Sequence, residues 1–161
     1  MRLTTLAALA ALLLLTGAGA PAPHPLTEAE VRAFMGTVEF AARSRDVQRL
    51  AGTLAAECRI ELRTQINGQE RVTLMTRDEY VEMLSSGYAS LHELQSYDYE
   101  VTAQTITLER DAPAATVVSQ VTETLVFADR RIVTHSEETV RVERRGGSLA
   151  IVAVSALTKG G

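Results

Sequence analysis

Hydrophobic and polar residues alternate along most of the stretch from Gln95 to Leu157, which predicts four long strands. Short polar turns join these strands, and no segment between them has helical periodicity. Such turns leave no room for a crossover helix, so consecutive strands must pair antiparallel. The first of them, over about residues 97–109, changes its hydrophobic phase between Val101 and Ile106, which indicates a β-bulge or a bend.

Two helices are predicted ahead of these strands. Thr27 and Glu30 form a capping box, which marks the start of a first helix that should end near Arg45. Asp46 then provides an N-cap for a short second helix that should include Leu54. On the first helix, the hydrophobic residues that recur at helical spacing are Val31, Phe34, Met35, Val38 and Ala42.

A hairpin should follow over residues 58–76. Residues 67 and 68 are Asn and Gly, the pair best suited to a type I′ turn because both positions need positive φ. Alternation in both strands predicts one apolar and one solvated face. We expect Val72 and Leu74 of the return strand to lie on the apolar face.

The whole chain therefore predicts one curved sheet covered by helices. Thr76 and Glu79 form a second capping box, so a third helix should separate the hairpin from the last four strands. The final strand, residues 149–157, is apolar in both phases, which favours a central position. A strongly twisted sheet of six strands cannot lie flat. We expect an α+β domain in which a curved antiparallel six-stranded sheet forms a cone, covered by three N-terminal helices.

The first twenty residues have the layout of a signal peptide. Arg2 supplies the positive start, residues 6–15 are an unbroken Leu/Ala core, and small residues follow. A core of about ten residues is shorter than the roughly twenty that span a bilayer, which disfavours the alternative of a retained membrane anchor. We expect a signal peptide over residues 1–18, a flexible leader over 19–25 and one domain over 26–158. The location is then periplasmic or secreted, with no membrane association after cleavage.

The charge of the chain bears on its partners, and its cysteine content bears on how it is stabilised. The 161 residues carry a net charge of −4, and the sixteen basic residues are scattered instead of forming the basic stripe of a nucleic-acid-binding protein. We therefore expect no nucleic-acid partner. Cys58 is the single cysteine, so no internal disulfide can form. No neighbouring group in the sequence would activate its thiol, and we interpret it as a buried core residue.

The order of elements, together with the ending from Val140 to Val154 (VRVERRGGSLAIVAV), resembles the nuclear-transport-factor-2-like superfamily. The bacterial SnoaL-like branches are the most similar, although Ser148 to Ile151 stand where those proteins typically have Trp-Arg-Ile. The resemblance covers residues 27–158 and implies the cone fold. That fold is shared by isomerases, dehydratases, cyclases and non-enzymatic adaptors, so it does not imply one activity.

Glu123 is the leading candidate for chemistry. It shares a strand face with Val121 and Leu125. If this face lines the cone, the carboxyl group lies in an apolar cavity and is suited to proton transfer. The alternative places Glu123 at a strand end or at a dimer interface, where water surrounds it.

Three further residues could contribute to a ligand site in the cone. Glu138 is in phase with Val140. Four tyrosines, Tyr80, Tyr88, Tyr97 and Tyr99, could direct hydroxyl groups into the same cavity, and of these we assign Tyr80 and Tyr99 to the ligand site. His135 shares its strand face with polar residues, so we expect it to be solvated and not a base. The three histidines lack paired-ligand spacing and no phosphate-binding loop is present, so we expect neither a metal nor a cofactor.

These observations leave three hypotheses about function. The leading one is an exported domain that binds a small apolar or amphipathic ligand, or a partner, without catalysis, because few polar groups are expected to converge in the cavity. The second is a cofactor-independent isomerase or dehydratase that acts on a small apolar substrate, with Glu123 as base and a tyrosine as donor. The third is an adaptor protein that forms a homodimer through its sheet.

Overall fold

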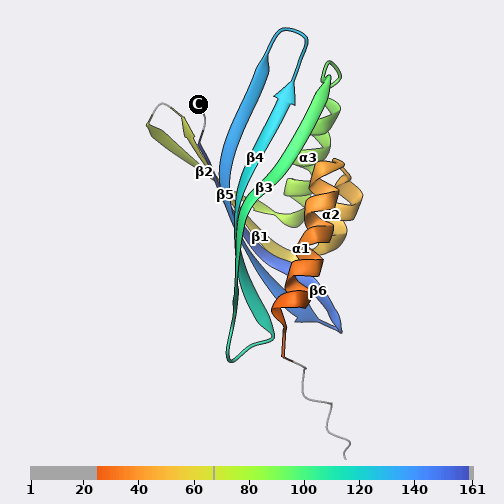
Figure 1. The fold of residues 1–161 in the computed structure, drawn as a ribbon, viewed down its shortest axis with the longest axis vertical. Helices are drawn as coiled ribbons and strands as arrows, with labels where there is room; N and C mark the ends of the chain where they lie inside the picture. Colours follow the sequence, from red (N-terminus) through yellow and green to blue (C-terminus); the bar gives the residue numbers. More distant parts are fainter. Residues whose placement is uncertain (1–24, 67, 160–161) are drawn as a thin grey trace, which may run out of the picture.

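The computed structural model describes residues 25–66 and 68–159 of the chain. The predicted signal peptide and residues 19–24 of the predicted leader lie outside the described residues. The elements follow the predicted order (Figure 1): α1 (Glu28–Arg43), α2 (Val47–Thr53), β1 (Leu54–Ile66), β2 (Gln69–Thr76), α3 (Arg77–Ala89), β3 (Ser96–Leu108), β4 (Ala114–Val126), β5 (Arg131–Arg145) and β6 (Ser148–Lys159).

All six strands belong to one sheet with the order β2-β1-β6-β5-β4-β3. The four last strands form the predicted antiparallel meander, and β6 lies in the predicted central position between β1 and β5. One pairing differs from the fully antiparallel sheet that the sequence predicts, because β1 and β6 run parallel. The connection through α3 explains this. It carries the chain back to the end of the sheet where β2 begins, so β3 runs in the same direction as β2. After three further reversals, β6 runs in the same direction as β1.

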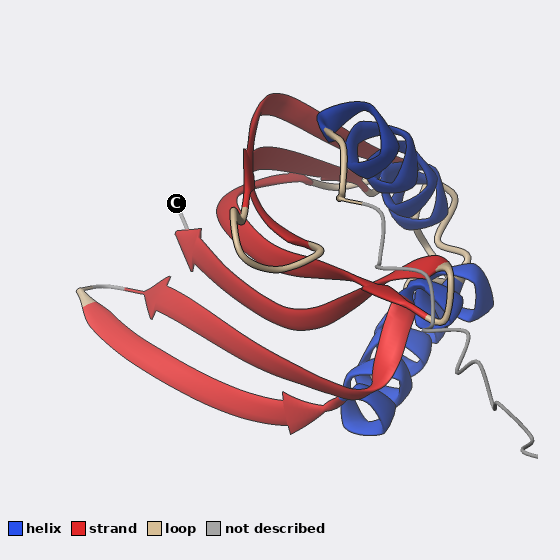
Figure 2. Cartoon of the chain, turned by 90° about the horizontal axis from the view of Figure 1, so that it is seen from below, coloured by secondary structure: helices blue, strands red, loops and turns tan. Residues whose placement is uncertain are grey.

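The sheet curls around the helices, and the fold class is the predicted α+β cone. In Figure 1 the three helices lie on one side of the sheet, and Figure 2 shows the strands bent into an arc whose hollow side faces them. Two arginines attach α1 to the sheet at different strands. The Nε of Arg43 donates to the carbonyl oxygen of Tyr99 on β3 over 3.1 Å, and Arg144 on β5 pairs with Glu30 over 2.6 Å.

The hydrophobic core fills one end of the space between α1 and the sheet. Burial of this apolar surface is the main stabilising contribution to the fold. Its members on the strands come from the first part of β1 and from the start of β4, the end of β5 and the start of β6, which lie next to one another in the sheet. The buried residues of this core are Leu26, Val31, Met35, Leu54, Cys58, Ile60, Ala115, Val117, Val140, Val142 and Ile151.

Both predicted capping boxes are present at the starts of α1 and α3. The side chain of Thr27 accepts from the backbone N–H of Glu30, and the carboxylate of Glu30 accepts from the backbone N–H of Thr27. Thr76 and Glu79 make the same reciprocal pair. The predicted end of the second helix was wrong: α2 ends at Thr53, and Leu54 opens β1 in extended backbone conformation.

The hairpin of β1 and β2 places its hydrophobic residues differently from the prediction. Ile66 pairs with Gln69 across the turn, so Val72 and Leu74 lie opposite Arg63 and Glu61. Cross-strand partners share a face, and both hydrophobic residues therefore lie on the outer side of the sheet, 50% and 73% exposed. The prediction of a common apolar face was wrong because the two-residue turn fixes the opposite register.

A β-bulge interrupts the pairing of β3 with β4, in the interval where the hydrophobic phase changes. Val101 pairs with Val121 and Ala103 pairs with Gln120, so Thr102 is left without a partner in the ladder. Its side chain donates instead to the carbonyl oxygen of Gln120 over 3.2 Å. One extra residue reverses the facing of every residue on the N-terminal side of the bulge. The first part of β3 consequently directs its odd-numbered residues toward the helices.

Among the described residues, no helix is long and apolar enough to cross a membrane.

Cys58 is buried within β1, as predicted, with 2% of its surface exposed. It is the fifth residue of that strand and not the first, because β1 starts at Leu54.

Candidate functional site

A cavity of about 260 Å³ lies between the concave side of the sheet and the helices. It adjoins the hydrophobic core at Val140 and Ile151 and extends from there toward the later part of β4 and the earlier part of β5. All four residues predicted for a ligand site line it: Tyr80, Tyr99, Glu123 and Glu138. The other lining residues are Val38, Ala42, Leu50, Leu54, Leu62, Met83, Leu84, Tyr88, Ser136, Val140, Ile151, Val154, Ala156 and Thr158.

Glu123 is held by a tyrosine of the neighbouring strand. The hydroxyl group of Tyr97 donates to Oε1 of Glu123 over 2.7 Å, and both side chains are partly buried. Tyr97 pairs with Leu125 in the ladder, so this hydrogen bond runs diagonally across the two strands. The carboxylate of Glu123 therefore has a fixed orientation at the cavity wall.

Glu138 is held by a tyrosine that reaches across a whole strand. Tyr99 on β3 pairs with Glu123 on β4, and its hydroxyl group extends past β4 to donate to Oε2 of Glu138 on β5 over 3.3 Å. The hydroxyl group of Ser136 donates to the other oxygen of Glu138 over 3.4 Å. Both hydrogen bonds are long, so a ligand in the cavity could replace them at modest cost.

The surroundings of Glu138 favour its neutral form. Burial raises the pKa of its carboxyl group, and the nearby charge of Glu123 raises it further. The hydrogen bonds from Tyr99 and Ser136 act in the opposite direction but do not outweigh burial. Glu138 therefore keeps its proton to a higher pH than an exposed glutamate does.

The tyrosines of the cavity stay protonated over the physiological range. Burial is the largest cause of a raised pKa at Tyr80, Tyr99 and the adjacent Tyr97. The charges of Glu138 and Glu123 raise the pKa of Tyr80 and Tyr99 further, and Glu123 alone does so at Tyr97. Burial also raises the pKa of Tyr88. Each phenol is thus available as a hydrogen-bond donor.

Arg45 lies beside this site and was not singled out from the sequence, whereas Tyr97 was among the tyrosines expected to reach the cavity but was not assigned to the ligand site. The guanidinium carbon of Arg45 lies 5.7 Å from the centre of the Tyr97 ring, and the ring of Tyr88 contacts the same tyrosine edge-on at 6.2 Å. Arg45 adopts φ of +55°, in the left-handed region that is uncommon for a residue with a side chain. The phase change in β3 was a signal for the facing of Tyr97, whereas nothing in the sequence marks the conformation of Arg45.

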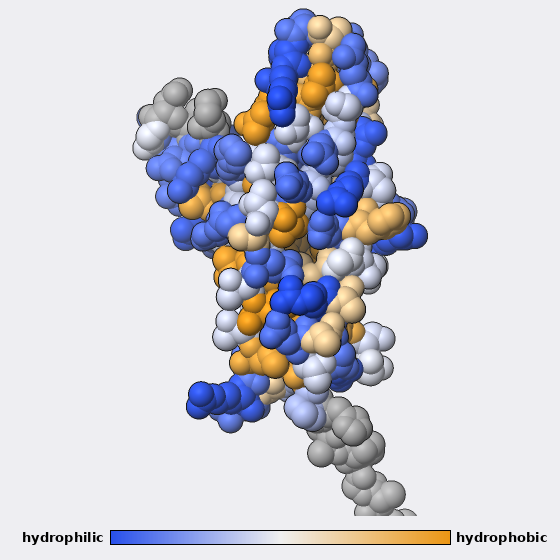
Figure 3. Space-filling model, viewed as in Figure 1, coloured by the Kyte–Doolittle hydropathy of each residue, from blue (hydrophilic) through white to orange (hydrophobic). Residues whose placement is uncertain are grey.

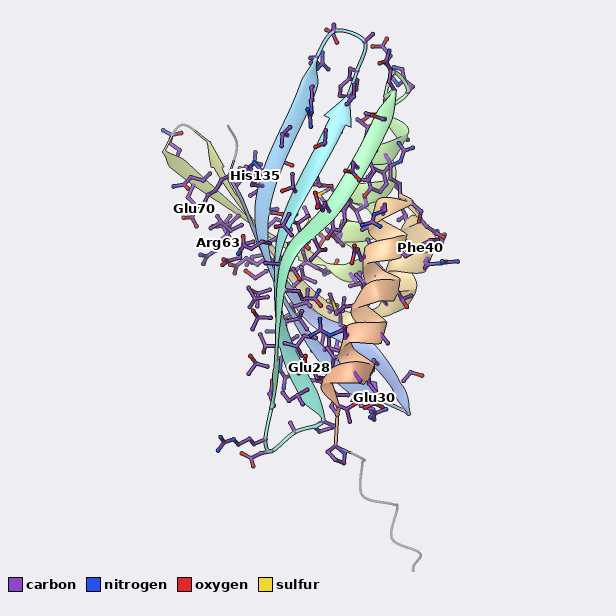
Figure 4. The ribbon with its side chains drawn as sticks, viewed as in Figure 1. Glu28, Glu30, Phe40, Arg63, Glu70 and His135 are labelled. Carbon is purple, nitrogen blue, oxygen red and sulfur yellow. The ribbon has the colours of Figure 1, made fainter. Side chains whose placement is uncertain are left out.

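His135 lies outside this site, as expected. It is exposed on the outer side of β5, and Figure 4 shows it with Arg63 and Glu70 on the side of the sheet away from the helices. Its Nδ1 lies 3.1 Å from the hydroxyl group of Thr122. Within residues 25–66 and 68–159, no group of three or more His, Cys, Asp and Glu side chains is placed to hold a metal ion.

Comparisons with known proteins identify similar folds but no close relative. No family model matches the sequence, and no curated protein sequence matches it. Three solved structures illustrate the similarity. A proposed scytalone dehydratase from Novosphingobium aromaticivorans is 12% identical with a TM-score of 0.61, and the match covers 81% of this chain and 82% of that one.

The other two structures carry a fold name without an activity. A nuclear-transport-factor-2-like protein from Cytophaga hutchinsonii is 13% identical with a TM-score of 0.60, over 82% of this chain and 98% of that one. A nuclear-transport-factor-2-like protein with a cystatin-like fold from Novosphingobium aromaticivorans is also 13% identical with a TM-score of 0.60, over 80% and 79% of the two chains. At these identities the similarity concerns the fold alone.

Proposed function

We propose that this chain, which has the nuclear-transport-factor-2-like fold, is a cofactor-independent isomerase or dehydratase with Glu123 as its base. The fold itself is the one that the sequence resembled. One observation carries the proposal: Glu123 lines a cavity together with tyrosine side chains, and the hydroxyl group of Tyr97 fixes its orientation. The similarity in fold to a proposed scytalone dehydratase also supports it.

The polar content of the cavity favours catalysis over simple binding. The hypothesis of a non-catalytic ligand-binding domain depended on few polar groups converging in the cone. The cavity instead contains two carboxyl groups and three phenols on otherwise mostly apolar walls. Carboxyl and phenol groups of perturbed pKa that converge on an otherwise apolar cavity are typical of active sites.

The geometry suggests a simple proton-transfer mechanism. Glu123 removes a proton from a carbon next to a carbonyl group, and the electrons of the broken C–H bond form an enolate. The hydroxyl group of Tyr99, in the cavity wall, donates a hydrogen bond to the enolate oxygen and stabilises its negative charge. Protonated Glu123 then returns the proton to another carbon, which is isomerisation, or to a departing hydroxyl group, which leaves as water.

Proton exchange tests this mechanism without knowledge of the substrate. The protein is incubated in heavy water with small cyclic ketones and β-hydroxyketones, and NMR follows the loss of the α-proton signals. We expect protein-dependent exchange with at least one ketone, and a rate lowered by about 100-fold or more in Glu123→Gln, as for loss of a general base. Glu137→Gln is the matched control, because Glu137 is exposed on the outer side of β5. Exchange that is equally fast in Glu123→Gln would exclude Glu123 as the base.

We also propose that the outer side of the sheet packs against a second copy of the chain. A groove of about 760 Å³ lies there between the hairpin and the rest of the sheet, with the exposed Leu74 in its wall. Arg59, Glu61 and Arg141 give the groove charges of both signs, so the same patch can be complementary to itself across a two-fold axis. Figure 3 shows hydrophobic residues reaching the surface among hydrophilic ones.

A further inference from the structure

The charged residues described in the cavity wall are all acidic. Among the described residues that line the cavity, two are glutamates and none is Lys, Arg or His. Two arginines contact tyrosines of β3 but do not line the cavity: Arg43 pairs with Glu39 and with the carbonyl oxygen of Tyr99, and Arg45 lies over the ring of Tyr97. The wall therefore contains no cation that could neutralise a carboxylate of the protein or bind one of a ligand.

This one-sided charge discriminates between classes of ligand. An anionic ligand would be repelled by Glu123 and Glu138 in surroundings where water screens charges poorly. A neutral ligand would gain nothing from the two carboxyl groups beyond hydrogen bonds. A cationic ligand would gain a direct ion pair, and it would compensate buried negative charge that the protein itself leaves without a cationic partner.

The aromatic and aliphatic walls define the rest of such a ligand. The rings of Tyr80, Tyr88 and Tyr99 line the same space, and tyrosine rings attract organic ammonium groups. Leu62, Leu84 and other aliphatic side chains form most of the remaining wall and suit a hydrophobic body. A volume of about 260 Å³ limits that body to a small molecule.

We infer that the substrate of this cavity is a small hydrophobic amine whose protonated nitrogen pairs with Glu138. This inference rests on the proposed function, because it takes the cavity as the active site and leaves Glu123 free to act on a nearby carbon. The long hydrogen bonds from Tyr99 and Ser136 allow Glu138 to exchange one of them for the ammonium group.

Pairing with an ammonium group requires that Glu138 be ionised. The groups that face it are Tyr99 from β3, Glu123 from β4, Ser136 from its own strand, and Tyr80 and Tyr88 from α3. Of these only Glu123 carries a charge, and together with burial it keeps the pKa of Glu138 above its ordinary value. The amine must therefore displace a proton at acidic pH, and its affinity should increase as the pH rises.

Calorimetric titration of the full chain with three probes of one shape tests the inference. The probes are phenylpropylamine, phenylpropanol and phenylpropionate, which end in an ammonium, a hydroxyl and a carboxylate group. Near neutral pH we expect the amine to bind at least about tenfold more tightly than the alcohol, and the carboxylate to bind most weakly, as for one well-formed charged contact. Glu138→Gln should remove the preference for the amine over the alcohol, whereas Glu137→Gln should keep the preference of the wild type.

A pH series on the wild type provides a measurement that does not depend on any variant folding. Between about pH 5 and pH 8, where a primary amine stays protonated, affinity for the amine should rise and affinity for the alcohol should stay constant. Binding of the alcohol as tight as that of the amine, or no binding of the amine, would overturn the inference. Glu123-dependent proton exchange without a preference for the amine would reject this substrate class and leave the proposed reaction standing. The preference for the amine without exchange would reject the proposed reaction alone.

Discussion

Tyr97 on β3 donates a hydrogen bond of 2.7 Å to the carboxylate of Glu123 on β4, diagonally across the ladder. The equivalent bond from Tyr99 to Glu138 is longer, 3.3 Å. The first bond therefore orients a carboxylate firmly, while the second leaves its carboxyl group able to change partners. This difference divides the cavity into a fixed part around Glu123 and an adaptable part around Glu138.

The difference between the two tyrosines can be measured as stability. Tyr97→Phe keeps the ring but removes a donor to a carboxylate, which should lower the free energy of unfolding by about 1 to 2 kcal/mol. Tyr99→Phe removes a longer bond and should cost less. Urea denaturation of both variants measures the two losses. Equal stability of Tyr97→Phe and the wild type would show that this bond contributes nothing in solution.

The stability of the protein should depend on pH through Glu138. Folding raises the pKa of this group above its ordinary value of 4.5, so the native state holds a proton that the unfolded chain has already released. The free energy of unfolding should consequently fall as the pH rises from 4.5 through the raised pKa.

Glu138→Gln cannot ionise and should lack this decrease. Its stability relative to the wild type should therefore be greater near pH 8 than near pH 5, as measured by urea denaturation at both values. Glu137→Gln, altered at the exposed neighbour, should keep the slope of the wild type. Parallel slopes for Glu138→Gln and the wild type would contradict the assigned environment of Glu138.

Much of the fold follows from local signals in the sequence. The two capping boxes start α1 and α3 where predicted, because each satisfies backbone N–H groups that a helix start leaves free. The parallel contact of β1 with β6 joins residues almost a hundred positions apart, and no local pattern encodes it. The outward facing of Leu74 could have been obtained by counting from the turn, since a two-residue loop fixes the register.

Part of the site was also predictable from local patterns in the sequence. Glu123 and Glu138 could be assigned to the cavity because each shares a phase with buried valines on its own strand. The facing of Tyr97 and Tyr99 depends on the place of the bulge at Thr102. The phase change between Val101 and Ile106 groups both tyrosines with Val101, but it did not identify which residue of that interval lacks a partner in the ladder.

Cys58 should be chemically inert in the folded protein. It is buried in the core, and burial together with the charge of Glu57 raises the pKa of its thiol to about 11. Because the thiolate is the reactive form, iodoacetamide should label it slowly near pH 8 in buffer and rapidly in urea. Mass spectrometry measures the labelled fraction. Rapid labelling of the native protein would mean that the core opens at this position.

Two replacements of Cys58 should distinguish the effect of side-chain size on stability from the effect of side-chain polarity. Cys58→Ser places a hydroxyl group in the core and should cost about 1 to 3 kcal/mol of unfolding free energy. Cys58→Ala leaves a small void without a new polar group and should cost less. Thermal denaturation of the two variants compares the losses, and a more stable serine variant would contradict the apolar surroundings.

The outer side of the sheet should determine the oligomeric state. Leu74 is 73% exposed in the groove wall, so Leu74→Glu should weaken a dimer that buries this surface. Light scattering should give the mass of a dimer for the wild type and of a monomer for Leu74→Glu, with unchanged circular dichroism. Phe40→Glu, on the exposed side of α1, is the control and should remain a dimer. A monomeric wild type would refute this arrangement.

The unpaired Thr102 also sets the electrostatic character of the cone. In an uninterrupted ladder, Asp98 and Glu100 would point toward the helices and Tyr97 and Tyr99 toward the solvent. Four acidic groups would then crowd one small space, and their mutual repulsion would oppose closure of the fold. The extra residue in β3 thus keeps Asp98 and Glu100 exposed to water, and Tyr97 and Tyr99 face the helices instead.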